Sequence, residues 1–239
     1  MCKVMGVVNV TPDSFSDGGQ FFKPEEAIRR AKNLVADGAD IIDLGGESTR
    51  PGATPIGWEE EWGRIEPVLE GLISLRGLRS LISIDTYHPE TAERAIKAGA
   101  HIINCVYAEP IPEMFRVIAD AAQDTELVMP ASCLSNLSNL SNLYLDPMIG
   151  FGTTREEDVE LLRSIPELAK KGRVLVGASR KRIVKKLTGE KSSVGKNIGG
   201  NVAIAVWAAM QGASVVRVHD VKETVQALRV VDALGEGER

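Results

Sequence analysis

Short apolar runs alternate with helical patterns along almost the whole chain. The apolar runs have the length of buried strands and lie at residues 4–10, 40–44, 81–85, 101–106, 127–132, 143–146, 173–178 and 213–218. Elsewhere apolar residues recur every three or four positions between Pro and Gly boundaries, which is typical of helices. The expected helices span residues 24–37, 58–75, 89–98, 112–122, 156–170, 179–187, 201–210 and 221–234. Pro67 and Pro166 fall inside two of these helices and predict a kink or break in each.

Eight strands that alternate with helices in 239 residues are most simply arranged as a closed (β/α)8 TIM barrel of the α/β class. The length fits a single domain over residues 1–239. A doubly wound open sheet is the alternative, but no Gly-x-Gly-x-x-Gly motif follows the first strand. The pattern therefore predicts one barrel.

The connection between the fifth and sixth strands departs from this pattern. The triplet Ser-Asn-Leu occurs three times in residues 135–143. A triplet repeat fits neither the helical nor the strand period, and Ser and Asn compete with the helix backbone for hydrogen bonds. We expect a shortened crossover here, either an irregular loop or a short helix within residues 133–142.

Composition and charge narrow the class of protein. The formal net charge is −5 and no stripe of Lys and Arg is present, so no nucleic-acid partner is expected. The cysteines, Cys2, Cys105 and Cys133, lack the spacing of a zinc site or a disulfide framework. Neither a signal peptide nor an apolar run of membrane-spanning length is evident. These features favour a cytoplasmic enzyme without a membrane partner.

Polar residues lie at the end of nearly every expected strand. In a barrel these ends meet at one rim, where active sites are built. The rim residues are Asn9, Thr49, Arg50, Asp85, Asn104, Asp146, Ser179, Arg180, Lys181, Arg217 and His219. Any one of them could be a turn or cap residue, but carboxylates and amides buried together in a barrel mouth are costly without a polar ligand.

The rim residues suggest a ligand with a flat heterocycle and an anion. Asp85, Asn104 and Asp146 offer acceptors and a donor that match an amino-pyrimidine edge. Arg217 could stack on such a ring and still direct its fork toward an anion. Asn9, Arg50 and His219 suit a phosphate or pyrophosphate, with Mg2+ on Asn9. The sequence has no evident Ser-His-Asp or Cys-His set, which favours substitution with an anionic leaving group over covalent catalysis.

Several of these residues belong to motifs that resemble those of the dihydropteroate synthase family. The two long motifs are NVTPDSFSDGG at residues 9–19 and DLGGESTRPGA at residues 43–53. The shorter ones, in the family's order, are SIDT at 83–86, DPMIGFG at 146–152, GASRK at 177–181 and RVHD at 217–220. The likeness covers most of the chain.

The resemblance implies a reaction and a set of roles. Members of the family join a dihydropterin that carries a hydroxymethyl pyrophosphate to p-aminobenzoate, and pyrophosphate leaves first in an SN1-like path. Catalysis is implied for Asp85, Lys181 and Arg217, with Mg2+ as cofactor. Pterin binding is implied for Asp85, Asn104, Asp146, Phe151, Lys181 and Arg217, and pyrophosphate binding for Asn9, Arg217 and His219, with the metal on Asn9. Binding of p-aminobenzoate is implied for Phe15, Thr49, Arg50, Pro51 and Arg182. A homodimer is also implied.

The chain differs from the family pattern at several positions. Cys105 stands where an Asp usually follows the Asn, Met148 replaces a usual Gly, and Thr153 stands where Lys is usual. The fifth strand lacks the family's Met-His-Met segment. Two other hypotheses therefore stay open, a pterin-dependent methyltransferase on the same barrel and a pterin-binding barrel without synthase activity.

Overall fold

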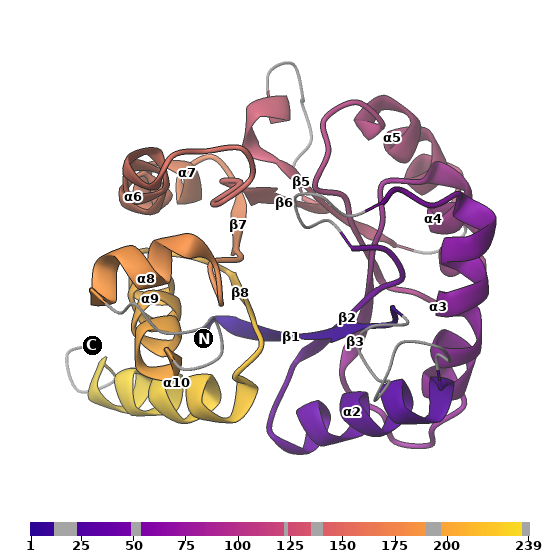
Figure 1. Cartoon of the computed structure of the whole chain (residues 1–239), viewed down its shortest axis with the longest axis horizontal. Helices are drawn as coiled ribbons and strands as arrows, with labels where there is room; N and C mark the ends of the chain where they lie inside the picture. The colour runs from indigo at the N-terminus through magenta and orange to yellow at the C-terminus, as the bar shows by residue number, and fades with distance from the viewer. Residues whose placement is uncertain (12–22, 49–53, 122–123, 135–140, 190–196, 236–239) are drawn as a thin grey trace.

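The computed structural model forms a closed barrel of eight parallel strands with helices outside it (Figure 1). The structure describes residues 1–11, 23–48, 54–121, 124–134, 141–189 and 197–235. The strands are β1 (Lys3–Asn9), β2 (Ile41–Gly45), β3 (Leu81–Asp85), β4 (Ile102–Asn104), β5 (Glu126–Pro130), β6 (Leu143–Asp146), β7 (Arg173–Val176) and β8 (Val215–Val218). They pair in chain order, and β1 closes the barrel against β8. The (β/α)8 barrel expected from the sequence is confirmed.

The helices follow the strands as the periodicity predicts. They are α2 (Pro24–Ala36), α3 (Trp58–Ile73), α4 (Pro89–Lys97), α5 (Ile111–Ala119), α6 (Arg155–Arg163), α7 (Ile165–Ala169), α8 (Arg182–Thr188), α9 (Ile198–Met210) and α10 (Val221–Gly235). Several begin with Pro in the first turn, where the missing N–H costs nothing. Within the described ranges, no helix has both the length and the apolar character needed to cross a bilayer.

The two internal prolines have different outcomes. Pro166 falls where the expected helix is divided into α6 and α7 around Ser164, so the predicted break is confirmed. Pro67 lies inside α3, which continues from Trp58 to Ile73, so a break is wrong there and the alternative of a kink stays a prediction. The Pro ring crowds the carbonyl four residues earlier. That residue is Gly63, which has open space where a Cβ would be, and the backbone has room to adjust.

The connection from β5 to β6 is short, as expected. Its described part contains a single turn of 3-10 helix at Ala131–Leu134, where the other strands are followed by α-helices (Figure 1). Six residues of the Ser-Asn-Leu repeat, 135–140, lie outside the described residues.

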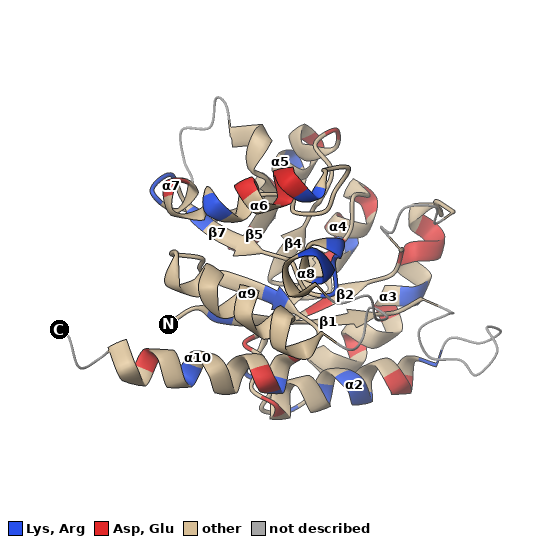
Figure 2. Cartoon of the chain, turned by 60° about the vertical axis from the view of Figure 1, so that its left-hand side comes forward, with Lys and Arg blue, Asp and Glu red and all other residues tan. Residues whose placement is uncertain are grey.

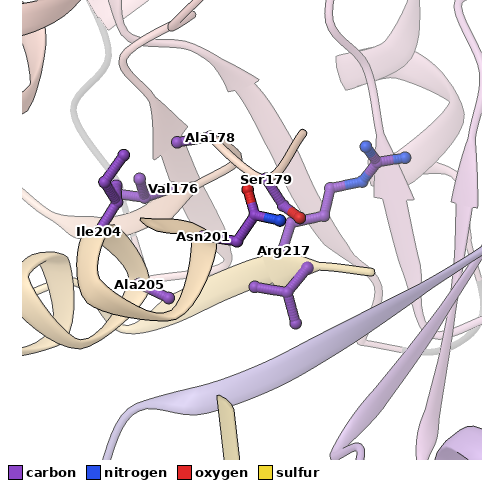
Figure 3. Close-up of a pocket in the computed structure, with 8 residues that line it drawn as sticks. Val176, Ala178, Ser179, Asn201, Ile204, Ala205 and Arg217 are labelled. Atoms are coloured by element: carbon purple, nitrogen blue, oxygen red, sulfur yellow. The ribbon is translucent and has the colours of Figure 1, made fainter. Parts of the chain in front are cut away.

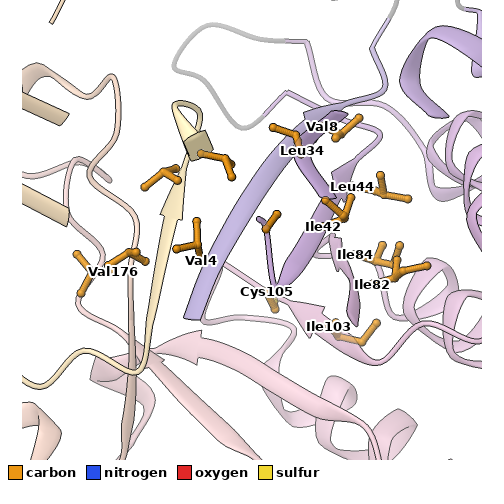
Figure 4. Close-up of a cluster of buried hydrophobic side chains, with 14 of the residues drawn as sticks. Val4, Val8, Leu34, Ile42, Leu44, Ile82, Ile84, Ile103, Cys105 and Val176 are labelled. Carbon is orange, nitrogen blue, oxygen red and sulfur yellow. The ribbon is translucent and has the colours of Figure 1, made fainter. Parts of the chain in front are cut away.

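Two layers of apolar side chains hold the barrel together. The strands and surrounding helices share the larger core, to which Val4, Ile42, Ile84 and Cys105 contribute (Figure 4). A smaller cluster fills the barrel interior; it consists of Met5, Ile41, Ile102, Val128, Tyr144, Leu175 and Val215. Because side chains alternate across each strand, the residues two positions further along several of these strands point into the barrel mouth. The interior cluster therefore forms the floor of the mouth.

The loop after β6 contains a residue in an unfavourable backbone conformation. Met148 has a φ of +67°, in the left-handed region that costs a residue with a Cβ about 1–2 kcal/mol. We predict that Met148→Gly raises the unfolding free energy by about 0.5–1 kcal/mol, because relief of strain exceeds the added entropy of the unfolded chain. Thermal unfolding should show a melting temperature about 1–4 °C higher. Met148→Ala keeps the strain and should give no gain; an equal gain for both variants would contradict the strain argument.

Candidate functional site

The centre of the barrel mouth is an ion-paired network around Asp43. This side chain points inward from β2, is fully buried and accepts hydrogen bonds from three strands. Ser83 Oγ on β3 donates at 2.6 Å, Arg217 Nε on β8 at 2.6 Å and Asn104 Nδ2 on β4 at 3.3 Å. The network therefore fixes β2, β3, β4 and β8 relative to one another at the rim.

Asp85 is the second carboxylate that pairs with Arg217. It ends β3, and its Oδ2 accepts from Arg217 Nη2 at 2.6 Å. Burial raises the pKa of Asp85 to about 7, against the attraction of Arg217 and with a further upward contribution from Asp43. For Arg217, burial lowers the pKa, but Asp43 and Asp85 outweigh it and the net direction is upward. Asp85 Oδ1 is buried and has no hydrogen-bond partner among the described residues.

Asn104 and Asp146 complete the polar mouth. Asn104 is the register partner of Asp85 across β3 and β4, and its Oδ1 is likewise buried without a partner in the part of the chain that the structure describes. Asp146 ends β6, and its Oδ1 accepts from the backbone N–H of Met148 at 2.7 Å. Burial raises the pKa of Asp146, while Lys181 and the Met148 N–H oppose that shift. The mouth thus contains two buried acceptor atoms, Asp85 Oδ1 and Asn104 Oδ1, that a ligand with N–H groups could pair with.

Lys181 is held in place from two sides. It precedes α8, and its Nζ donates to the carbonyl oxygen of Ile149 at 2.5 Å. The same nitrogen lies 4.1 Å from the centre of the Phe151 ring, within the range of a cation–π contact. Burial lowers the pKa of Lys181 to about 8, against the opposite effect of Asp146. The Phe151 ring therefore contacts the ammonium group of Lys181.

His219 directly follows β8, the strand that carries Arg217, and Asn9 ends β1, which pairs with β8. His219 Nδ1 is 3.1 Å from Ser179 Oγ, and the backbone N–H of His219 donates to the same hydroxyl oxygen at 3.3 Å. Asn9 ends β1 beside Gly45. If Gly45 carried a Cβ atom, that atom would lie 3.9 Å from Asn9 Oδ1 and 3.9 Å from Asp85 Oδ2. The two oxygens therefore border the small space beside Gly45.

That space fits Mg2+ by the chemistry of its donors. Mg2+ prefers amide, carboxylate and phosphate oxygens and usually takes only one or two of them from the protein. Asn9 Oδ1 is an oxygen of this kind, whereas Asp85 Oδ2 already accepts a hydrogen bond from Arg217 Nη2 at 2.6 Å. Over the described ranges, no group of three or more His, Cys, Asp and Glu is arranged to hold a metal ion, so substrate oxygens would have to supply most of the ligands.

Of the remaining candidates for p-aminobenzoate binding, the structure describes Arg182 alone. Arg182 begins α8 with an exposed side chain. Phe15, Thr49, Arg50 and Pro51 lie outside the described residues. Cys105 is fully buried in the outer core, where burial raises the pKa of its thiol to about 12, so this position supplies a small apolar side chain instead of a carboxylate.

Asp43 was not among the site residues predicted from the sequence, although it lies in the second long motif. A signal was present, because period-two alternation in β2 places Asp43 on the same face as Ile41, which points into the barrel. A buried acidic side chain on that face needs a cation beside it, and Arg217 is that cation.

Comparison with known proteins identifies this arrangement. The model of the pterin binding enzyme family matches residues 5–136 and 137–219. The dihydropteroate synthase of Staphylococcus haemolyticus is 38% identical over 99% of this chain and 96% of its own length. The structure of Xanthomonas albilineans dihydropteroate synthase with 4-aminobenzoic acid has a TM-score of 0.87 and 39% identity, and covers 98% of this chain and 93% of its own.

A second structure of the Xanthomonas albilineans enzyme, in complex with 7,8-dihydropteroate, has a TM-score of 0.82 and 35% identity, and covers 98% of this chain and 94% of its own. The family model and the full-length relatives agree with one another, and the closed barrel agrees with the solved structures. The chain belongs to the dihydropteroate synthases, a family of pterin-binding transferases.

Proposed function

We propose that this chain joins a dihydropterin carrying a hydroxymethyl pyrophosphate to p-aminobenzoate, forming dihydropteroate and pyrophosphate. The observation that carries this proposal is the pair of buried acceptors without partners, Asp85 Oδ1 and Asn104 Oδ1, at the mouth of the barrel. A buried acceptor left unpaired costs about 1–3 kcal/mol. N–H groups on the edge of a pterin would remove that cost, whereas an apolar ligand would not.

The pterin would lie across the acceptors from β3, β4 and β6. Asp85, Asn104 and Asp146 would face its amino and ring N–H groups, and Lys181 would donate to its carbonyl oxygen. Phe151 keeps Lys181 in place through the cation–π contact. Arg217 has five N–H donors, so its ion pairs with Asp43 and Asp85 can position it while it contacts the ring and the leaving group.

The pyrophosphate would lie beside β1 and β8. His219 and Arg217 would contact its oxygens, and Asn9 Oδ1 would hold Mg2+ together with those oxygens. When bound, Mg2+ would offset part of the negative charge that develops on the leaving group. Ser179 contacts Nδ1 of the His219 ring at 3.1 Å and so helps to orient that ring.

The p-aminobenzoate would lie at the outer end of the site. Arg182, at the start of α8, would face its carboxylate, and Phe15, Thr49, Arg50 and Pro51 would contact its ring. In the reaction the bond between the methylene carbon and the pyrophosphate oxygen breaks, a bond from that carbon to the amine nitrogen forms, and the amine loses one proton. None of these residues needs to form a covalent intermediate.

The three cysteines support a proposed cytoplasmic location. Cys2, Cys105 and Cys133 are all free thiols, which is the usual state of cysteines in a reducing compartment.

We predict that the purified protein, given the dihydropterin pyrophosphate and Mg2+, releases pyrophosphate only when p-aminobenzoate is present. A sulfonamide should compete with p-aminobenzoate and leave the affinity for the pterin unchanged.

Lys181→Met should lower kcat/KM about 10- to 100-fold, because a charged hydrogen bond of about 1.5–3 kcal/mol is lost. Lys185→Met, on the same helix, is the matched control and should stay within about twofold. Pterin binding without turnover would contradict the proposal.

We further propose that the protein forms a homodimer through α9. This helix has no charged residue, and it exposes Ile198, Trp207 and Met210 at 41%, 37% and 65%. The neighbouring α10 exposes Val230 and Leu234. Figure 2 shows α9 in tan, in contrast to the charged residues on the other outer helices. A solvent-exposed apolar face of this kind is typical of a protein–protein interface.

The dimer can be tested in solution by sedimentation. The wild type should sediment with twice the mass of the chain, and Met210→Glu should sediment as a monomer, because it places a charge in the apolar interface. Ile73→Glu introduces the same charge at an exposed apolar residue of α3, away from α9, and should remain a dimer. A monomeric wild type, or a dimeric Met210→Glu variant, would contradict this interface.

A further inference from the structure

The turn between β7 and α8 contains a residue in a left-handed conformation. Arg180 has a φ of +61°, which a residue with a Cβ adopts about 5- to 30-fold less readily than an ordinary conformation. Its two neighbours are site residues, Ser179 beside His219 and Lys181 beside Phe151. The conformation of Arg180 therefore determines where both of these side chains point.

Asn201 on α9 holds the backbone of this turn. Its Oδ1 accepts from the backbone N–H of Arg180 at 3.0 Å, and its Nδ2 donates to Asp220 Oδ2 at 2.8 Å. The side chain is 3% exposed. A carboxamide provides an acceptor and a donor together, so Asn201 links an N–H group to a carboxylate without an unpaired atom on either side.

Asp220 completes the connection from β8. Its Oδ1 accepts from Arg180 Nη2 at 2.8 Å. Its carbonyl oxygen accepts from Thr224 in the first turn of α10, at 3.1 Å from the N–H and 2.8 Å from Oγ1. We call Arg180, Asn201 and Asp220 the rim clamp. It joins the loops after β7 and β8 to α9 from outside the barrel mouth.

A small gap in the packing lies beside the turn. A small cavity of about 10 Å3 lies between the turn, α9 and β8, lined by Ser179, Asn201, Ile204 and Arg217 among others (Figure 3). That volume holds at most about one water molecule. In Figure 3 the Arg217 guanidinium extends away from the side chains of α9 and the turn. The hydrogen bonds of the rim clamp therefore hold the turn next to a small gap in the packing.

We propose that Asn201 and Asp220 are positioning residues for the reaction. They stabilise the left-handed conformation of Arg180 and so keep Lys181 and the Ser179–His219 pair directed into the barrel mouth. Neither residue contacts the substrate. This inference rests on the proposed function, in which Lys181 contacts the pterin and His219 the pyrophosphate.

The test is a mutant cycle that separates backbone conformation from side-chain charge. Asn201→Ala is made in the wild type and in two variants of Arg180. In Arg180→Gly, residue 180 adopts the left-handed conformation without strain. Arg180→Ala keeps the strain, and both variants lose the ion pair with Asp220. Alone or with Arg180→Ala, Asn201→Ala should lower kcat/KM for the dihydropterin pyrophosphate about 5- to 30-fold. With Arg180→Gly it should cost less than about threefold.

Equal losses in all three backgrounds would overturn the proposal, since they would show a general structural role for Asn201. If Asn201→Ala does not fold, Asn201→Leu takes its place in the same cycle, because Leu fills a similar volume and cannot accept from the Arg180 N–H.

A second measurement is independent of turnover. The chain has three histidines, so the imidazole resonance of His219 can be assigned by NMR. Asn201→Ala should shift this resonance in the wild type and with Arg180→Ala, and leave it almost unchanged with Arg180→Gly. A wild type without amine-dependent pyrophosphate release would refute the proposed function alone. An unshifted His219 resonance, or equal shifts in all backgrounds, would refute the positioning role.

Discussion

The site depends on one partly buried cation, Arg217, which is shared by two carboxylates. Asp43 and Asp85 each contact it at 2.6 Å. Loss of one partner from a buried ion pair costs about 3–5 kcal/mol, a large fraction of the stability of a typical domain. The three residues come from β2, β3 and β8, which are brought together only when the barrel closes. Closure of the fold and assembly of the site are thus the same event.

The charges in the mouth are not fully balanced without a ligand. Asp43, Asp85 and Asp146 face the cations Arg217 and Lys181, and at Asp85 burial outweighs the attraction of Arg217 and raises the pKa to about 7. Lys181 responds in the opposite direction, to about 8. Both shifts express the cost of charge in a site that excludes water. Donors on a bound pterin would meet the acceptors that lack partners, so the site is built for a polar ligand.

Backbone strain lies beside these charged residues. Met148 follows Asp146 by two residues and Arg180 directly precedes Lys181, and these are the non-glycine residues with positive φ in the described part of the chain. Strained residues often lie at functional sites, where the surrounding structure fixes them. Here the Asp146 carboxylate holds the N–H of Met148, and Asn201 holds that of Arg180. The side chains of the loops are therefore placed by hydrogen bonds that span different elements.

Much of the fold and of the candidate site could be predicted from the sequence. The strand pattern gave the barrel, and polar strand ends identified Asp85, Asn104, Asp146 and Arg217, because the parallel strands of a barrel end at one rim. Asp43 was missed because it lies two residues before the end of β2 and is therefore deeper in the barrel than the residues at the rim. Contacts such as Asn201 with Arg180 depend on how α9 docks against the turn, and no local pattern encodes that docking.

The central claim is that ionised Asp85 is a ligand acceptor in a buried, charge-paired mouth. It is tested most directly by calorimetry of a dihydropterin without pyrophosphate across pH. Burial raises the pKa of Asp85 to about 7, so its charge is present above that pH and is lost as the pH falls through it. Affinity should therefore fall on the acid side of about pH 7, and Asp85→Asn should bind about tenfold more weakly with that acid limb removed. A wild type whose affinity does not change between pH 6 and 8, or an Asp85→Asn variant with the same acid limb, would contradict this account.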